Sequence, residues 1–222
     1  MPHPGTLGRR PGRVRAVTVS QPRRRLSAAD RRSQLIDVGR QAFADLGYEA
    51  ATVEEIARRA GITKPIVYGH FGGKEGLYSV IVEQETAYIL KAISEAIATG
   101  TPRERVEAAA RTFLEYVRDH RAGFTVLARD SPASRQYASM LAEIGARVCD
   151  IFSDEFARAG YDPSNAPIYA QALIGMVTYV GQWWDDDRSR PVSDVGSHLA
   201  ALAWMGLRHL PRKPSTVTPS GT

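Results

Sequence analysis

The spacing of helix signals along the chain constrains its fold most strongly. Gly, Pro and N-capping residues recur at helical intervals, and the Ala-rich segments between them lack the apolar–polar alternation that marks strands. The sequence therefore predicts an all-α protein of about nine helices and no sheet. The expected helices cover about 27–46, 52–61, 63–72, 74–99, 101–119, 120–129, 133–159, 165–187 and 192–209.

Capping residues mark where several of these helices begin and end. In a capping box, two residues three positions apart each satisfy a backbone N–H of the other. Three pairs have this spacing: Ser27 and Asp30, Thr52 and Glu55, and Thr101 and Glu104. Gly47 is expected to cap the end of the first helix, and Thr63 the start of the third, with Pro65 in its first turn.

The formal net charge of +5 is concentrated at the two ends of the chain. Residues 1–29 contain seven Arg and no acid, and residues 208–222 contain three basic residues and no acid. Residues 30–207 have 19 basic side chains against 24 acidic ones. We expect a disordered basic arm over 1–24 and a disordered tail over 211–222.

Several protein classes are excluded by the sequence. A single cysteine, Cys149, excludes an intrachain disulfide framework and favours a reducing, cytoplasmic location. The longest uncharged run, 163–184, contains two Pro and several amides, so we expect a buried helix there and no contact with a membrane. The His residues lack metal-ligand spacing, and no Gly-rich nucleotide loop is present. We therefore expect no metal, no cofactor and no enzymatic activity.

Residues 53–72 have the pattern of a helix-turn-helix. Ala57 is small where two helices cross closely, Gly61 follows where the turn needs a positive φ, and Val67 supplies the apolar contact of the second helix. Such a motif places its second helix in the major groove of DNA. The alternative is an ordinary helical hairpin in which Gly61 only caps a helix.

The segment 51–77 resembles the amino-terminal domain of the TetR family of transcriptional regulators. Its most specific part is Tyr-Gly-His-Phe-Gly-Gly-Lys-Glu-Gly-Leu at 68–77, and the match extends to about 27–80. The rest of the chain resembles the family in its all-helical length and order. The resemblance implies a homodimer that binds a palindromic operator, with a carboxy-terminal domain that binds a small inducer and thereby releases DNA.

The resemblance also assigns DNA-binding roles residue by residue. Thr52, Tyr68 and Lys74 match the family's phosphate-binding positions, and Lys64 is expected to reach guanine O6 and N7. For Tyr68 and His70 the alternative is packing against the first helix. The predicted DNA-binding residues are Thr52, Thr63, Lys64, Pro65, Ile66, Tyr68, His70 and Lys74.

Two glycines depart from the family pattern, and the domain around them has little net charge. Gly69 reduces the readable surface of the recognition helix, and Gly73 leaves the fourth helix with a weak cap. Residues 30–74 carry seven basic and six acidic side chains. We therefore expect the arm over 1–24 to add affinity through the minor groove or flanking phosphates, the alternative being a solvated tail.

The last two expected helices are candidates for dimerisation. The helix over 165–187 is apolar nearly all round, and the helix over 192–209 has an apolar face with small residues beside it. The resemblance implies that both form a four-helix bundle with their copies across a two-fold axis. The alternative is a monomer with a thick core.

Aromatic and Met residues concentrate in the helices that bound the family's ligand pocket. They indicate a largely apolar or aromatic ligand, although such residues also build ordinary cores. The predicted pocket residues are Phe113, Tyr116, Phe124, Tyr137, Met140, Phe152, Tyr169, Met176, Tyr179 and Trp183.

We thus expect a helix-turn-helix domain over 25–74 and a helical ligand-binding and dimerisation domain over 75–210. The expected function is that of a repressor, bound as a homodimer to a palindromic operator in double-stranded DNA and released by an unknown small-molecule ligand. The alternatives are a constitutive regulator without a ligand and a helical small-molecule-binding protein with a vestigial helix-turn-helix.

Overall fold

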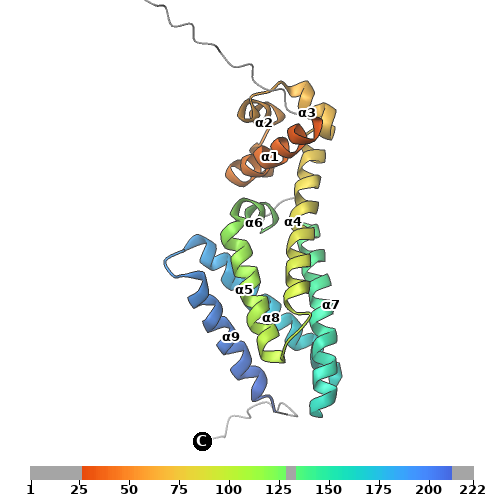
Figure 1. Cartoon of the computed structure of the whole chain (residues 1–222), viewed down its shortest axis with the longest axis vertical. Helices are drawn as coiled ribbons and strands as arrows, with labels where there is room; N and C mark the ends of the chain where they lie inside the picture. Colours follow the sequence, from red (N-terminus) through yellow and green to blue (C-terminus); the bar gives the residue numbers. More distant parts are fainter. Residues whose placement is uncertain (1–26, 129–133, 212–222) are drawn as a thin grey trace, which may run out of the picture.

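The computed structural model describes residues 27–128 and 134–211, and within them every regular element is helical (Figure 1). This confirms the predicted all-α fold. The expected arm over 1–24 and all but the first residue of the expected tail over 211–222 lie outside the described residues. The helices are α1 (Ala28–Ala50), α2 (Val53–Ala60), α3 (Lys64–Phe71), α4 (Lys74–Ala96), α5 (Pro102–Asp119), α6 (Arg121–Ala128), α7 (Ser134–Ala159), the 3-10 turn η1 (Pro163–Asn165), α8 (Ala166–Asp186) and α9 (Val192–Arg208).

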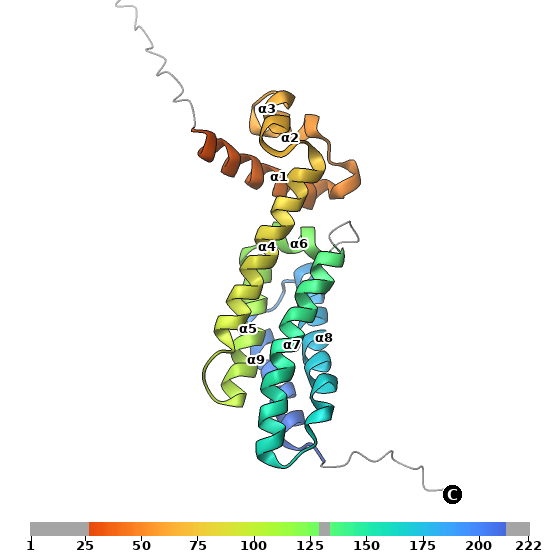
Figure 2. The same cartoon turned by 90° about the vertical axis from the view of Figure 1, so that its right-hand side faces the viewer.

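The helices form an elongated molecule with a small group at one end. Figures 1 and 2 show α1, α2 and α3 together at that end, with α4 running from them along the rest of the molecule. Below this group, α5 packs against α9 and α7 against α8, while α6 packs against α1. Helix α4 contacts both α1 and the α5–α7 group, so one continuous helix joins the two parts.

Helix ends differ from the sequence prediction where the chain bends. Gly47 has φ 79° and ψ 165°, so it interrupts α1 as expected, but helical structure resumes and runs on to Ala50. Helix α4 ends at Ala96 rather than near Thr99, and the buried Ile97 is its C-cap residue. At the start of α4, Gly73 makes no side-chain cap, as the sequence predicted.

The three predicted capping boxes have different outcomes. The box at Thr101 and Glu104 is complete. The Glu104 N–H donates to Thr101 Oγ1 at 3.3 Å, and the Thr101 N–H donates to Glu104 Oε2 at 2.8 Å. Ser27 accepts from the N–H of Asp30, but its hydroxyl also donates to the Asp30 carboxylate. The box predicted for Thr52 and Glu55 is only half formed, because the Glu55 carboxylate binds arginines of its own helix instead.

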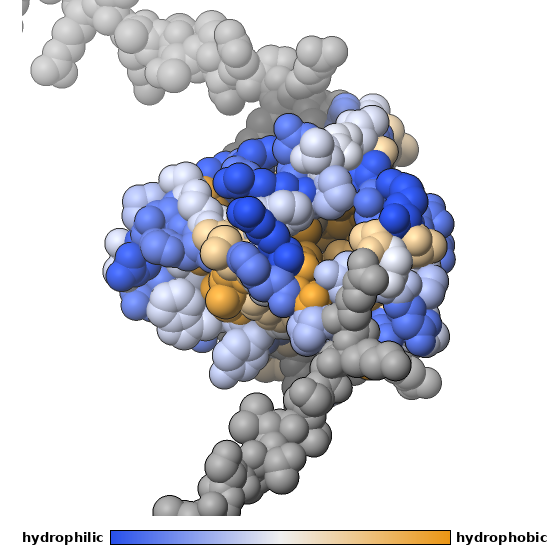
Figure 3. Space-filling view, turned by 90° about the horizontal axis from the view of Figure 1, so that it is seen from below, coloured by the Kyte–Doolittle hydropathy of each residue, from blue (hydrophilic) through white to orange (hydrophobic). Residues whose placement is uncertain are grey.

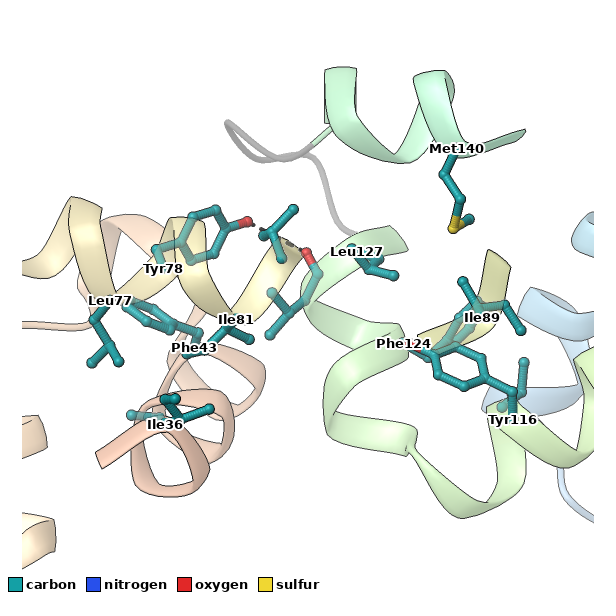
Figure 4. Close-up of a cluster of buried hydrophobic side chains, with 14 of the residues drawn as sticks. Ile36, Phe43, Leu77, Tyr78, Ile81, Ile89, Tyr116, Phe124, Leu127 and Met140 are labelled. Atoms are coloured by element: carbon teal, nitrogen blue, oxygen red, sulfur yellow. Dashed lines mark hydrogen bonds between the residues drawn. The ribbon is translucent and has the colours of Figure 1, made fainter. Parts of the chain in front are cut away.

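One apolar core extends through both parts of the molecule. Figure 4 shows Phe43 of α1 beside Leu77, Tyr78 and Ile81 of α4, and farther along α4 shows Ile89 beside Phe124 of α6. The Tyr78 hydroxyl donates to the carbonyl of Val126 at 3.4 Å, which ties α4 to α6. Because these residues share one core, the helices α1–α3 are held in a fixed position against the rest of the molecule.

A buried carboxylate, that of Glu85 in α4, lies where the two parts meet. Its side chain is 5% exposed, and Arg40 of α1 reaches it with Nε 2.7 Å from Oε1, an ion pair whose N–H is not aligned for a hydrogen bond. The Tyr116 hydroxyl of α5 donates to Oε2 at 3.0 Å. A Cβ added at Gly123 of α6 would lie 2.2 Å from Oε2. We call Arg40, Glu85, Tyr116 and Gly123 the Glu85 junction, since it brings together α1, α4, α5 and α6.

Candidate functional site

The turn between α2 and α3 has the geometry of a helix-turn-helix. Gly61 adopts the left-handed conformation with φ 65° and ψ 36°, and the N–H of Ile62 donates to the carbonyl of Ala57 at 3.0 Å. Ile56 of α2 and Val67 of α3 are fully buried between the helices. The buried side of α3 is thereby fixed, and its opposite side faces outward.

Most of the predicted DNA-binding residues share this outward surface. Thr52, Thr63, Lys64 and Pro65 are exposed, and they stand at the starts of α2 and α3. On α3 itself, Ile66 is 37% exposed and Tyr68 53% exposed. His70 and Lys74 are partly buried.

The two threonines differ in their local bonds. Thr52 Oγ1 accepts from the N–H of Glu55 at 3.2 Å, which places the hydroxyl at the start of α2, where a phosphate is favourably bound. Thr63 is the N-cap residue of α3, as predicted, but its side chain makes no capping hydrogen bond. Pro65 lies in the first turn of α3, where the missing N–H removes one of the donors that a cap would satisfy.

Lys64 is paired with an acid beside the recognition surface. Its ammonium forms an ion pair with the carboxylate of Glu54 in α2, and both side chains are about half exposed. The hydrogen bond from Lys64 lowers the pKa of Glu54. The sequence did not predict this partner, and its carboxylate offsets the positive charge that Lys64 would bring to a base.

Lys74 lies at the joint between α1 and α4. Its Nζ donates to the carbonyls of Tyr48 at 2.8 Å and Glu49 at 3.3 Å, and it lies 4.3 Å from the centre of the Tyr48 ring. These bonds satisfy carbonyls at the end of α1 that have no partner within the helix. An ammonium has three donors, so one N–H stays available for a phosphate.

The remaining α3 positions have simple surroundings. The His70 ring lies 6.1 Å from that of Phe71 in a tilted arrangement, and Arg32 of α1 lies over the Phe71 ring at 4.8 Å. A Cβ at Gly69 would meet nothing within 4 Å, so this part of α3 is open surface.

An apolar cavity of about 230 Å³ lies between α4, α5, α7, α8 and α9. Its lining residues include Ile93 of α4, Ile97 just after α4, Phe113 of α5, and Phe152 and Phe156 of α7. Polar side chains also line it, namely Arg105, Glu155, Tyr161, Thr178 and Arg208. Sequence reasoning did not select these polar residues, although Arg105 precedes Ala109 and Phe113 on one face of its helix, at four-residue spacing.

Of the ten predicted pocket residues, Phe113 and Phe152 line this cavity. Tyr116, Phe124 and Met140 lie in the core around α4 and α6, because their helices turn these faces away from the cavity. Tyr169 packs against Phe156 and Met176 against the main core. Tyr179 and Trp183 lie on an exposed face of α8, and the side chain of Tyr137 is outside the described residues.

Helices α8 and α9 leave large apolar side chains exposed. On α8, Ile168, Tyr179 and Trp183 are exposed, with Tyr179 at 74%. On α9, Leu202 and Met205 are exposed, with Leu202 at 66%. Exposed apolar side chains that gather in one patch often mark an interaction surface.

The described residues offer neither a membrane span nor a metal centre. Across 27–128 and 134–211, no helix is long and apolar enough to cross a bilayer. In the same residues, no group of three or more His, Cys, Asp or Glu side chains is placed to hold a metal ion.

Comparison with known proteins connects this geometry to a family. Residues 35–81 match the family model described as bacterial regulatory proteins, tetR family, and residues 102–206 match the tetracyclin repressor-like C-terminal domain. The HTH-type transcriptional activator FasR of Mycolicibacterium smegmatis is 27% identical over 191 residues, which cover 84% of this chain and 87% of that protein. The HTH-type transcriptional repressor Rv1474c of Mycobacterium tuberculosis is 28% identical over 127 residues, 55% of this chain and 64% of that protein.

A solved structure shows the same arrangement of helices. The TetR-like transcriptional regulator from Rhodococcus sp. RHA1 superimposes with a TM-score of 0.69 and 26% identity, covering 84% of this chain and all of that one. Both parts of the chain thus match models of the same family of regulators. The chain belongs to the TetR family of DNA-binding transcriptional regulators.

Proposed function

We propose that the protein is a ligand-responsive regulator that reads a palindromic operator with α3 and is released from it by a small apolar ligand. The observation that carries this proposal is the path of α4. Its first turn contacts the end of α1 through Lys74. At its other end, Ile93 in the last turn and the C-cap residue Ile97 line the apolar cavity. A ligand that favours one position of α4 therefore also changes the position of α1–α3, which carry the recognition helix.

The proposed active form is a homodimer through α8 and α9. Its support is the exposed apolar side chains that both helices present, which a second copy would cover. A two-fold dimer that reads a palindrome needs its recognition helices about 34–36 Å apart, one turn of DNA. Ligand binding that changes this spacing lowers operator affinity, with typical couplings of about 5- to 150-fold.

Repression is the proposed outcome of operator binding, because a bound dimer blocks access to the DNA beneath it. Activation is the second candidate, since the relative matched over most of both chains is named an activator. A reporter placed behind the selected operator separates the two, because deleting the regulator raises expression under repression and lowers it under activation.

Unbiased binding-site selection with the full-length protein tests the proposal. We expect a palindrome to be enriched, and Lys64→Ala to relax the preference at one position of each half-site. Lys74→Ala is expected to weaken all sequences alike and to lower the salt slope by about one. A purified dimer without palindrome selectivity at any salt concentration would refute the proposal and leave a helical binding protein with a vestigial motif.

A further inference from the structure

Two arginines line one end of the apolar cavity. Arg105 lies in the first turn of α5, and Arg208 is the last residue of α9. Both helix ends lie at the end of the molecule opposite α1–α3 (Figure 1). Figure 3 views this end and shows hydrophobic residues in a hollow surrounded by hydrophilic ones.

One hydrogen-bond donor of Arg105, at this apolar site, has no acceptor in the part of the chain that the structure describes. Its Nε is buried and has no hydrogen-bond partner among the described residues, and of the three such side-chain atoms it alone belongs to a residue that lines the apolar cavity. A buried N–H without an acceptor is unfavourable and gains most from a charged one. Three other polar side chains of the lining have partners: Glu155 pairs with Arg158 at 2.8 Å, Thr178 donates to the Ile174 carbonyl at 2.8 Å, and Tyr161 donates to the Leu210 carbonyl at 3.0 Å.

We propose that the cavity takes an amphiphile whose anionic head binds Arg105 and whose apolar part lies against residues such as Phe113. This rests on the proposed function and names the ligand class of the same cavity. The guanidinium is a planar fork of donors that matches a carboxylate or a phosphate, and Arg208 adds a second positive charge. Because Arg158 already holds the Glu155 carboxylate, the described lining presents an excess of positive charge to the head.

Calorimetric titration of the full-length protein tests the headgroup. The probes are decanoate, decyl phosphate, decanol and decylamine, which share one apolar chain. We expect the better of the two anions to bind at least about tenfold more tightly than decanol, the size expected of a charge-assisted hydrogen bond. Decylamine is expected to bind most weakly. Comparing the first two probes distinguishes a carboxylate source from a phosphate source.

Variants assign the effect to Arg105. Arg105→Gln is expected to reduce anion affinity to that of decanol, while decanol binding and the unfolding temperature stay unchanged. Arg105→Lys keeps the charge without the fork and should recover only part of the loss. The matched control is Arg103→Gln, an exposed cation in the same turn that does not line the cavity, and it should leave all four affinities unchanged.

Equal binding of decanoate, decyl phosphate and decanol overturns the inference, as does an anion preference that survives Arg105→Gln. Tightest binding of decylamine overturns it in favour of Glu155 as the head partner. Absence of binding by all four probes also overturns it. Operator selection on the same preparation keeps the two proposals separate, because palindrome selectivity without any amphiphile binding removes this inference and preserves DNA reading.

Discussion

Glu54 is an exposed carboxylate on the surface that we propose binds DNA. In the free protein its charge is balanced by Lys64, whose ammonium it binds. On DNA the two groups have opposite effects, since the lysine is attracted to the phosphates and base edges and the carboxylate is repelled by the phosphates. We therefore expect the Glu54 carboxylate to lower the affinity for DNA.

Glu54→Gln is expected to raise affinity for DNA of any sequence by about two- to fivefold at low salt, because it frees Lys64 and removes a repelling charge. Fluorescence anisotropy with operator and random duplexes measures the change. Glu83→Gln, at an exposed position of α4, is the control for the change in net charge. A gain of the same size in that control would remove the specific role of Glu54.

The bonds of Glu55 predict that acid weakens the helix-turn-helix. Hydrogen bonds from Arg58 and then Arg59 lower the pKa of Glu55 to about 2, below its ordinary value of 4.5. A lowered folded pKa contributes stability that is present above about pH 4.5 and is lost as the pH falls toward 2.

Glu55→Gln is therefore expected to destabilise the protein at pH 7 and to differ less from the parent as the pH falls through this range. Urea unfolding at several pH values measures the difference, with Glu107→Gln as an exposed control. A difference between parent and variant that does not change with pH would show that the ion pairs of Glu55 add nothing to stability.

At the scale of helices, the Glu85 junction fixes how α1 sits on α4, α5 and α6. Gly123 matters there because it has no side chain. In an eight-residue helix, Gly to Ala usually stabilises by up to ~1 kcal/mol, but here the added Cβ would lie 2.2 Å from Glu85 Oε2.

Gly123→Ala is expected to destabilise the protein by ~1–3 kcal/mol through overpacking. The matched control is Gly69→Ala in α3, also an eight-residue helix, where a Cβ meets nothing within 4 Å and the change is expected to be neutral or stabilising. Thermal unfolding of both variants measures this. Equal stability of the two would mean that α6 can move away from the carboxylate without cost.

Across the whole molecule, the helices and the helix-turn-helix could be predicted from the sequence because they depend on residues close together in the chain. Gly61 forms the turn after α2, and Val67 lies in the helix that follows this turn. The capping box of Thr101 and Glu104 forms within four residues. Long-range choices were not predictable. Lys74 binds carbonyls about 25 residues earlier in the chain, and Glu55 binds arginines rather than its expected cap.

The cavity shows the same limit. Aromatic composition selected ten residues, yet which of them face a common space depends on how five helices are rotated against one another. Phe113 and Phe152 face it, while Tyr179 lies on an outer surface. Periodicity gives the apolar face of a helix, but it does not say whether a neighbour, a ligand or a second chain covers that face.

The charge distribution leads to a prediction for the chain as a whole. The seven Arg within residues 1–25 lie outside the described residues, and the motif region itself is nearly neutral. Deleting residues 1–24 is expected to lower operator affinity and the salt slope, by about 0.9 for each lost phosphate contact, with little change in sequence preference. Binding curves at several salt concentrations measure it, and an unchanged slope would exclude the arm from DNA contact.

The contact between Gly123 and the Glu85 carboxylate also has an evolutionary meaning. A Cβ at position 123 would lie 2.2 Å from Oε2 of the Glu85 carboxylate, which contacts both Arg40 and Tyr116. Among descendants of a common ancestor, these two positions should therefore covary, with an acid at 85 retained where 123 is Gly and replaced by a shorter or neutral residue where 123 has gained a side chain.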